Sequence, residues 1–359
     1  MSTPTKDAII EQLRTVDDPE LHQDIVTLNM VRNVTTDGGN VVVEVELTTP
    51  ACPMKGTIRR DVEAAVGRVP GVTNVSVEFS ARVRGQAKTV VQMPGVKNVI
   101  AVGAGKGGVG KSTVAALLAV GLKREGARVG LLDADVYGPS IPTLMGVEGS
   151  RLGVRDDKII PIEAVGVKLI SIGFFIDPEQ AVVWRGPMVH GAVQQFLGDV
   201  DWGELDYLVV DLPPGTGDVP LTLSQSIPMT GSVIVCTPQD LALSDARRAI
   251  MMYEKLNVPC LGIVENMSYY VCPNCRHRDA IFDHGGAKRA AGELNVPFLG
   301  EIPLNADLRV FADEGTPQKC FNTADDELRA AVTHVVRAVA GQVSVRASMG
   351  QAQPTLSVE

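Results

Sequence analysis

The sequence has no uninterrupted apolar stretch long enough to span a bilayer, and its first residues, Met1–Lys6, are polar with no apolar run behind them. These absences argue against a membrane-spanning helix and against a secretory signal. The formal net charge of -9 provides no basic excess, which disfavours nonspecific binding to DNA or to an anionic membrane. We therefore expect a cytoplasmic protein whose partners include neither nucleic acid nor membrane.

Cysteine is scarce, with six residues in the chain, at positions 52, 236, 260, 272, 275 and 320. In a long chain without an export signal, thiols are expected to stay reduced. The close pair Cys272 and Cys275 is then typical of a metal-binding or redox-active site rather than of a structural disulfide. Cys236 and Cys260 lie in or beside apolar runs, which predicts inert core thiols.

The length of 359 residues predicts two or three domains, at about 100–200 residues each. Residues 1–85 have the pattern of a small α+β domain. Its expected elements are a helix from about Asp7, a strand at Asn40–Leu47, a helix at Thr57–Val66 and a strand at Asn74–Phe79. We expect residues 86–95 to form a linker and residues 341–359 to form a flexible tail.

Residues 96–340 predict a larger domain built of βα repeats. The expected strands are nearly continuous apolar runs, which is typical of parallel strands buried on both faces: Asn98–Val102, Val129–Leu132, Tyr207–Val210, Ser232–Val235 and Leu261–Val264. Helical stretches such as Thr113–Lys123 and Ser244–Leu256 separate these strands. We therefore predict an α/β fold with a doubly wound, mostly parallel sheet.

A glycine-rich segment, Gly105-Lys-Gly-Gly-Val-Gly-Lys-Ser112, fits the phosphate-loop pattern G-x-x-x-x-G-K-[ST] between a predicted strand and a predicted helix. Backbone N–H groups of such a loop surround phosphate oxygens, and the helix N-terminus adds positive charge. Lys111 should reach the β- and γ-phosphates, and the Ser112 hydroxyl should bind Mg²⁺. The predicted ATP-binding residues are Gly105, Gly107, Gly108, Val109, Gly110, Lys111, Ser112 and Thr113. A glycine-rich turn without a ligand is the alternative.

Acidic residues follow two of the predicted strands. Asp133 and Asp135 come just after Leu132, and Asp211 ends the segment that begins at Asp206. Ligands of open α/β sheets sit at the carboxyl ends of the strands, so these carboxylates are expected beside the phosphate loop. A single Asp in such a position is often a turn or cap residue, but three of them together favour a catalytic site.

Lys106 is an additional lysine inside the loop and by itself fits a solvated loop residue. The segment Lys-Gly-Gly-Val-Gly-Lys-Ser-Thr, however, resembles the deviant Walker A sequence of the MinD/ParA/nitrogenase-iron-protein class of ATPases. That resemblance implies an ATP-dependent homodimer in which Lys106 reaches the partner's nucleotide. It further implies that Asp135 orients or activates the attacking water, Asp133 supports Mg²⁺ or the water network, and Asp211 holds Mg²⁺ through water.

Two further positions resemble the adenine site of that class. Asn266 follows a predicted strand and resembles its adenine-reading Asn, whose amide can both donate and accept hydrogen bonds. The segment Ile302-Pro303-Leu304 resembles its purine-pocket stretch, which points to Pro303. A lone Asn after a strand is more often a turn residue, and that alternative stays open.

The segment Cys272-Pro-Asn-Cys275 places two thiolates where they can bind one metal centre. A cubane cluster needs four ligands, and a symmetric dimer would supply the other two. The main alternative is zinc, held within one chain by Cys272, Cys275, His277 and His284. A disulfide or an unliganded pair is the remaining possibility.

Longer segments resemble the Mrp-type iron–sulfur carrier ATPases: Asp133-Ala-Asp-Val-Tyr-Gly-Pro-Ser, Trp184-Arg-Gly-Pro-Met, Asp211-Leu-Pro-Pro-Gly-Thr-Gly-Asp and Glu265-Asn-Met-Ser. The front domain resembles that of iron–sulfur assembly factors, with Asp18-Pro-Glu20 and Thr48-Thr-Pro-Ala-Cys52-Pro53. The resemblance implies that Cys272 and Cys275 of two chains bind a [4Fe–4S] cluster at the dimer interface. It also implies transfer to apo-proteins, with cluster scaffold proteins as further partners.

Two other functions fit the ATPase motifs. A positioning ATPase of the MinD/ParA kind predicts a basic patch or a C-terminal amphipathic helix, and the residues after Gly341 show neither. An ATP-driven reductase component is the second alternative. In the front domain, Cys52 precedes a predicted helix start, which would favour the thiolate. A partly buried thiol in a small core is an equally good interpretation.

Overall fold

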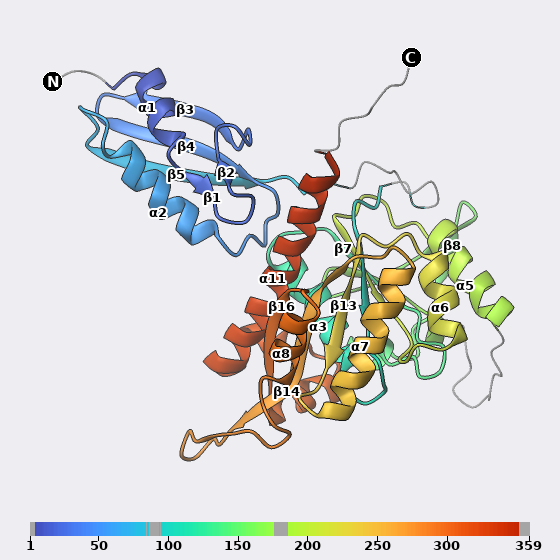
Figure 1. Cartoon of the computed structure of the whole chain (residues 1–359). Coiled ribbons are helices and arrows are strands. Elements are labelled where there is room, and N and C mark those ends of the chain that lie inside the picture. The colour runs from blue at the N-terminus through green and yellow to red at the C-terminus, as the bar shows by residue number, and fades with distance from the viewer. Residues whose placement is uncertain (1–3, 84, 86–92, 94, 176–185, 352–359) are drawn as a thin grey trace. The chain divides into compact units, whose positions relative to one another are not determined.

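The computed structural model describes residues 4–83, 85, 93, 95–175 and 186–351. The chain divides into two compact units, residues 1–84 with 344–359 and residues 85–343 (Figure 1). Most of the predicted linker, residues 86–92 and 94, lies outside the described residues, and so does Trp184.

The small unit is an α+β domain, as the sequence predicts. Its sheet has the order β3 (Val31–Asp37), β4 (Asn40–Leu47) and β5 (Asn74–Ala81), with β4 antiparallel to β3 and parallel to β5. Helices α1 (Lys6–Leu13) and α2 (Lys55–Val66) contribute to the core together with residues of the connecting segments. Alternation along β4 buries its four odd-numbered residues, because successive side chains of a strand point to opposite faces. A short ladder joins β1 (Asp17–Asp18) to β2 (Gln23–Asp24).

The large unit is built on one mostly parallel sheet, which confirms the predicted fold class. The strand order is β10-β11-β7-β12-β6-β13-β14-β15, with β16 also paired to β14. The parallel strands are β6 (Val99–Gly103), β7 (Val129–Asp133), β11 (Val167–Ser171), β12 (Tyr207–Asp211), β13 (Gly231–Cys236), β14 (Cys260–Val271) and β16 (Phe298–Leu304). The antiparallel additions are β10 (Ile162–Ala164) and β15 (Arg278–Asp279). Every residue of β6, β7, β12 and β13 is buried, as expected for strands covered on both faces.

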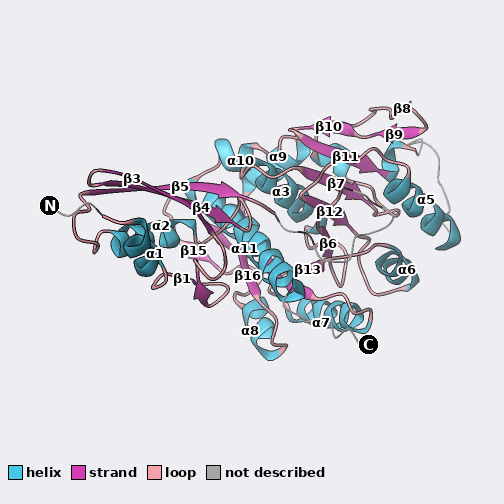
Figure 2. Cartoon of the chain, turned by 90° about the horizontal axis from the view of Figure 1, so that it is seen from above, coloured by secondary structure: helices cyan, strands magenta, loops and turns pink. Residues whose placement is uncertain are grey.

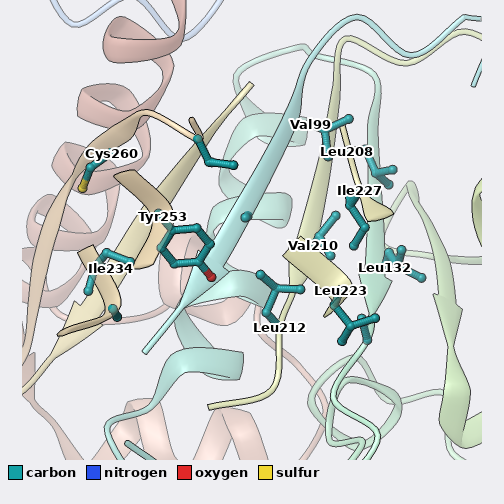
Figure 3. Close-up of a cluster of buried hydrophobic side chains, with 14 of the residues drawn as sticks. Val99, Leu132, Leu208, Val210, Leu212, Leu223, Ile227, Ile234, Tyr253 and Cys260 are labelled. Carbon is teal, nitrogen blue, oxygen red and sulfur yellow. The ribbon is translucent and has the colours of Figure 1, made fainter. Parts of the chain in front are cut away.

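Helices cover both faces of this sheet (Figure 2). On one face lies α3 (Lys111–Arg124), and α11 (Asp326–Gln351) packs on it where Gly121 faces Val336. The other face carries α5 (Gly186–Gly198), α6 (Asp218–Ser226), α7 (Asp240–Lys255) and α8 (Gly286–Glu293). Figure 3 shows part of the core beneath these helices, where Leu223 of α6 and Ile227, the residue that follows this helix, meet side chains of β6, β7 and β12.

Shorter elements complete the unit: α4 (Ile141–Leu144), the hairpin of β8 (Gly153–Arg155) and β9 (Lys158–Ile160), the 3₁₀ turn Ile172–Phe174, α9 (Ala306–Asp313) and α10 (Lys319–Asn322). The prediction of a flexible tail from residue 341 is wrong for residues 341–351, because α11 continues to Gln351. Val339 and Val343 are both buried and stand four residues apart, which extends the apolar stripe of this helix. Among the described residues, no helix is long and apolar enough to cross a membrane.

Candidate functional site

The predicted phosphate loop joins the carboxyl end of β6 to the start of α3. Gly108 and Gly110 have φ angles of +82° and +81°, a left-handed region that glycine adopts without steric cost. Gly105 lies against α7, so closely that a Cβ there would be 2.2 Å from the carbonyl oxygen of Asp245. The path of the loop therefore depends on three glycines. Gly108 and Gly110 allow the left-handed turn, and Gly105 allows the close approach of the loop to α7.

Lys111, the first residue of α3, lies inside a cluster of carboxylates and is 6% exposed. Its Nζ is 2.6 Å from Asp211 Oδ1 and 3.3 Å from Asp135 Oδ2, and it donates a hydrogen bond to Ser112 Oγ at 3.1 Å. The structure thus brings together four of the predicted residues from three separate segments. Lys106 is half-buried in the loop, and its reach to a partner stays a prediction.

Asp211 offers a partly unsatisfied carboxylate beside the loop. It is fully buried at the end of β12, and its Oδ2 has no hydrogen-bond partner among the described residues. Burial raises the pKa of Asp211, and the Lys111 ammonium opposes that rise. An orphaned carboxylate oxygen near the Ser112 hydroxyl fits Mg²⁺, which prefers oxygen ligands and keeps several waters.

Asp133 is the register partner of Asp211 on the neighbouring strand β7. Both of its oxygens are occupied: Oδ1 accepts a hydrogen bond from the N–H of Asp135, and Oδ2 accepts from the N–H of Ile141 and from Ser171 Oγ at 2.8 Å. Burial, together with the charge of Asp211, raises the pKa of Asp133 to about 8. Through these hydrogen bonds Asp133 links the ends of β7 and β11 beside the phosphate loop. Ser171 holds Asp133 in place, and the sequence did not indicate this role.

Asn266 and Pro303 lie on the paired strands β14 and β16, where Asn266 is the register partner of Ile302. The Asn266 side chain is buried, and its Nδ2 donates a hydrogen bond to the carbonyl oxygen of Val109 at 2.9 Å. The structure therefore places Asn266 at the phosphate loop and Pro303 on the neighbouring strand. The contact with Val109 joins positions 157 residues apart, which no local pattern could have indicated.

The cysteine pair follows directly on β14. Cys272 is half-buried, Cys275 is exposed, and both are free thiols. The turn is closed by hydrogen bonds from the N–H of Arg276 to the carbonyl of Cys272 and from the N–H of Cys272 to the carbonyl of His277. Backbone N–H groups of Cys275 and Asn274 lower the pKa of Cys272, which favours the thiolate that a metal requires.

The two histidines near the pair do not complete a zinc site. His284 Nε2 lies 2.8 Å from Glu301 Oε2, and His277 is exposed. Among the described residues, no group of three or more His, Cys, Asp or Glu side chains is placed to hold a metal ion. One chain thus offers two free thiols at this position.

The remaining described cysteines are core residues. Cys236, Cys260 and Cys320 are buried, as is Cys52 in the small unit. Burial raises the pKa of Cys52 to about 12, despite hydrogen bonds from the backbone at the start of α2. Of the two interpretations of Cys52, the structure therefore supports the buried core thiol, because desolvation outweighs the effect of the helix N-terminus.

Comparison with known proteins identifies the larger domain. Residues 95–340 match the model of a family described as the NUBPL iron-transfer P-loop NTPase. The chain belongs to this family. Residues 6–77 match a second family model, described as an iron–sulfur cluster assembly protein.

Several relatives are similar over nearly their whole length. An iron–sulfur cluster carrier protein of Deinococcus radiodurans is 53% identical over 344 residues, which are 95% of this chain and 96% of the relative. One from Escherichia coli K12 is 42% identical over 329 residues, 90% of this chain and 89% of the relative. A solved structure, an Archaeoglobus fulgidus nucleotide-binding protein in complex with ADP, is 44% identical with a TM-score of 0.58, covering 64% of this chain and 90% of that one.

A more distant structure supports the fold alone. The Mg-ADP complex of the septum site-determining protein MinD from Pyrococcus horikoshii is 21% identical, with a TM-score of 0.50, over 67% of this chain and 94% of that one. The large unit is thus a P-loop NTPase domain of the MinD-like fold.

Proposed function

We propose that this chain is an ATP-hydrolysing iron–sulfur cluster carrier. It binds a [4Fe–4S] cluster as cargo between Cys272 and Cys275 of two copies and passes the cluster to apo-proteins. The observation that carries the proposal is the cysteine pair itself, accessible, on a tight turn, and with two thiolates per chain where a cubane cluster takes four. The names of the relatives support the same assignment.

The phosphate site supports the ATPase half of the proposal. When ATP enters, its phosphates replace the carboxylates as partners of Lys111, whose charge then stabilises the transferred phosphoryl group. The Ser112 hydroxyl and, through water, Asp211 would hold Mg²⁺, which would supply positive charge to the phosphates. Asp135, released from Lys111, accepts a hydrogen bond from the attacking water. Lys106 of one copy contacts the nucleotide that is bound to the other copy.

Anaerobic reconstitution with iron and sulfide tests the cargo. The expected product is a brown dimer with about four iron atoms, the content of one cubane cluster. Cys272→Ser and Cys275→Ser should each abolish the colour and the transfer to an apo-acceptor, while ATP binding survives because the phosphate loop is a separate segment. Cys52→Ser is the matched control and should keep the interface cluster.

Three results would contradict the proposal. Tightly bound zinc at one atom per chain, lost in His277→Ala and His284→Ala, would assign a zinc site. A cluster that changes redox state but never leaves for an acceptor would assign a reductase component. Nucleotide-dependent binding to DNA or to vesicles, without iron uptake, would assign a positioning ATPase.

A further inference from the structure

Strand β14 contacts the phosphate loop through Asn266, and Met267 lies beside this contact. The Asn266 amide donates to the carbonyl oxygen of Val109 at 2.9 Å. A Cβ built on the next residue, Gly110, would lie 2.2 Å from Asn266 Nδ2 and 3.8 Å from Met267 Cε. Val109 and Asn266 are both buried, so the loop and the strand are in direct contact and no water layer separates them.

The segment between β14 and α8, residues 272–285, carries the cysteine pair and is called the cysteine loop below. The residue before Asn266 holds the far end of this loop. Glu265 is fully buried, and its carboxylate accepts hydrogen bonds from the N–H groups of Gly285 and Ala287 at 2.9 Å and 2.7 Å. Since side chains of a strand alternate between the two faces, Asn266 faces the phosphate loop and Glu265 faces α8. The near end of the same loop, Cys272, continues β14 directly. Both ends of the cysteine loop are therefore fixed to the strand that touches the phosphate site.

The strand is irregular at the point of contact. Asn266 pairs with Ile302 and Tyr270 pairs with Leu304, so residues 267–269 of β14 stand opposite Pro303 alone. Met267 has a φ angle of +54°, a left-handed conformation that is strained for a side chain of this kind. The Ser268 hydroxyl donates to Glu265 Oε1 at 2.5 Å and holds the bulge against the buried carboxylate. Bulges are places where a strand re-aims its side chains, and strained backbone is common at switching segments.

We propose that Asn266 is a positioning residue that couples the phosphate loop to the cysteine pair through the bulge of β14. The inference rests on the proposed function for the identity of the two ligands. A phosphate group in the loop is surrounded by backbone N–H groups, including those around Val109 and Gly110. Any reorientation of those peptides moves the carbonyl that Asn266 holds, and the strand carries that movement to Cys272. By linkage, a metal centre at the cysteines changes the affinity for nucleotide by the same factor.

Alkylation of the metal-free protein by iodoacetamide, followed residue by residue with mass spectrometry, measures this coupling without cluster or hydrolysis. Saturating Mg–AMPPNP should change the labelling rate of Cys272 or Cys275 by about fivefold, within the range usual for coupled sites. Mg–tripolyphosphate, which lacks adenine, should produce a similar change in the native chain, because the path starts at the phosphate loop. The change should persist at protein concentrations low enough for the chain to be a monomer, since the path lies within one chain.

Asn266→Ala, and Asn266→Leu as a variant that keeps the volume, should abolish the change at saturating ligand. Asn322→Ala, an exposed asparagine in α10, is the matched control and should keep it. Full retention of the labelling change in the Asn266 variants, or no change with tripolyphosphate in the native chain, would overturn the coupling. A labelling change without any cluster uptake would instead contradict the proposed function alone.

Discussion

Lys111 and Asp211 form a buried ion pair in which Nζ lies 2.6 Å from Oδ1. Asp135 stands on the other side of the same ammonium, at 3.3 Å. Lys111 is the lysine expected to bind phosphate, and Asp211 and Asp135 are the carboxylates expected to bind Mg²⁺ and the attacking water. In this structure the lysine and the two carboxylates form ion pairs with one another. In the proposed mechanism, ATP binding exchanges these partners.

Replacement of this lysine tests the phosphate site. Lys111→Ala should lower kcat for ATP hydrolysis by about 10²–10³-fold or more, because it removes a charge aimed at the transferred phosphoryl group. It also leaves buried carboxylates without their cation, which costs about 3–5 kcal/mol of stability at pH 7. Phosphate release and urea denaturation measure the two effects. Lys123→Ala, exposed in the last turn of the same helix, is the control, and unchanged turnover in Lys111→Ala would contradict the ATPase assignment.

Asp133 should make stability depend on pH. Its pKa is raised from the ordinary value of 3.8 to about 8, so between these values the folded chain binds more protons than the unfolded chain. Its contribution to stability is therefore complete at low pH and is lost as the pH rises toward 8. The urea midpoint of the nucleotide-free protein should fall between pH 6 and 8.5, and Asp133→Asn should reduce that slope. An equal slope in Asp133→Asn and in the exposed control Asp201→Asn would rule out Asp133 as the cause.

Two glycines of the phosphate loop should respond differently to alanine. A Cβ at residue 105 would overlap the backbone of Asp245, whereas at residue 107 the nearest atom, Cγ of Pro214, is 3.9 Å away. Gly105→Ala should thus cost about 1–3 kcal/mol, as overpacking usually does, and should displace α7 from the loop. Gly107→Ala should leave the unfolding free energy nearly unchanged. Equal urea midpoints for the two variants would show that the loop is not held by α7.

Lys106 should contribute to ATP hydrolysis only when two copies of the chain form a dimer. Lys106→Ala should keep nucleotide binding but lose most hydrolysis, and its residual turnover should no longer rise with protein concentration. Steady-state ATPase rates and sedimentation with and without ATP provide the measurement. Lys288→Ala, exposed in α8, is the control. Normal turnover in Lys106→Ala would show that this lysine is an ordinary loop residue.

Five of the six thiols should label in two classes. Cys272, whose pKa is lowered, and the exposed Cys275 should react first with iodoacetamide at pH 7.5. Cys52, Cys236 and Cys320 should react only after unfolding, because burial raises the pKa of each to about 12 and blocks access. Mass spectrometry in the presence and absence of urea distinguishes the classes. Fast labelling of Cys52 in the folded chain would contradict its interpretation as a buried core thiol and would support a functional thiol.

Local pattern was sufficient for much of the fold. The predicted strands at Asn98–Val102, Val129–Leu132 and Tyr207–Val210 each lie within one residue of β6, β7 and β12 at both ends. These strands are continuous apolar runs bounded by polar residues, and such signals need no knowledge of the partner strand. By contrast, β14 extends to Val271, well past the predicted end at Val264. Its outer half is stabilised by pairing with β15 and β16, which a local pattern does not contain.

The sequence by itself determined the phosphate loop, the acidic strand ends and the cysteine pair, because each is a short run of residue types whose chemistry is set by spacing. Only the tertiary structure decided that Lys111 pairs with Asp211 and Asp135, that Asp133 is held by Ser171, and that Asn266 reaches Val109. It also decided that the His284 side chain contacts Glu301 and that Cys52 is buried. These contacts join residues far apart along the chain, and their energies depend on burial, which exists only once the sheet and its helices have packed.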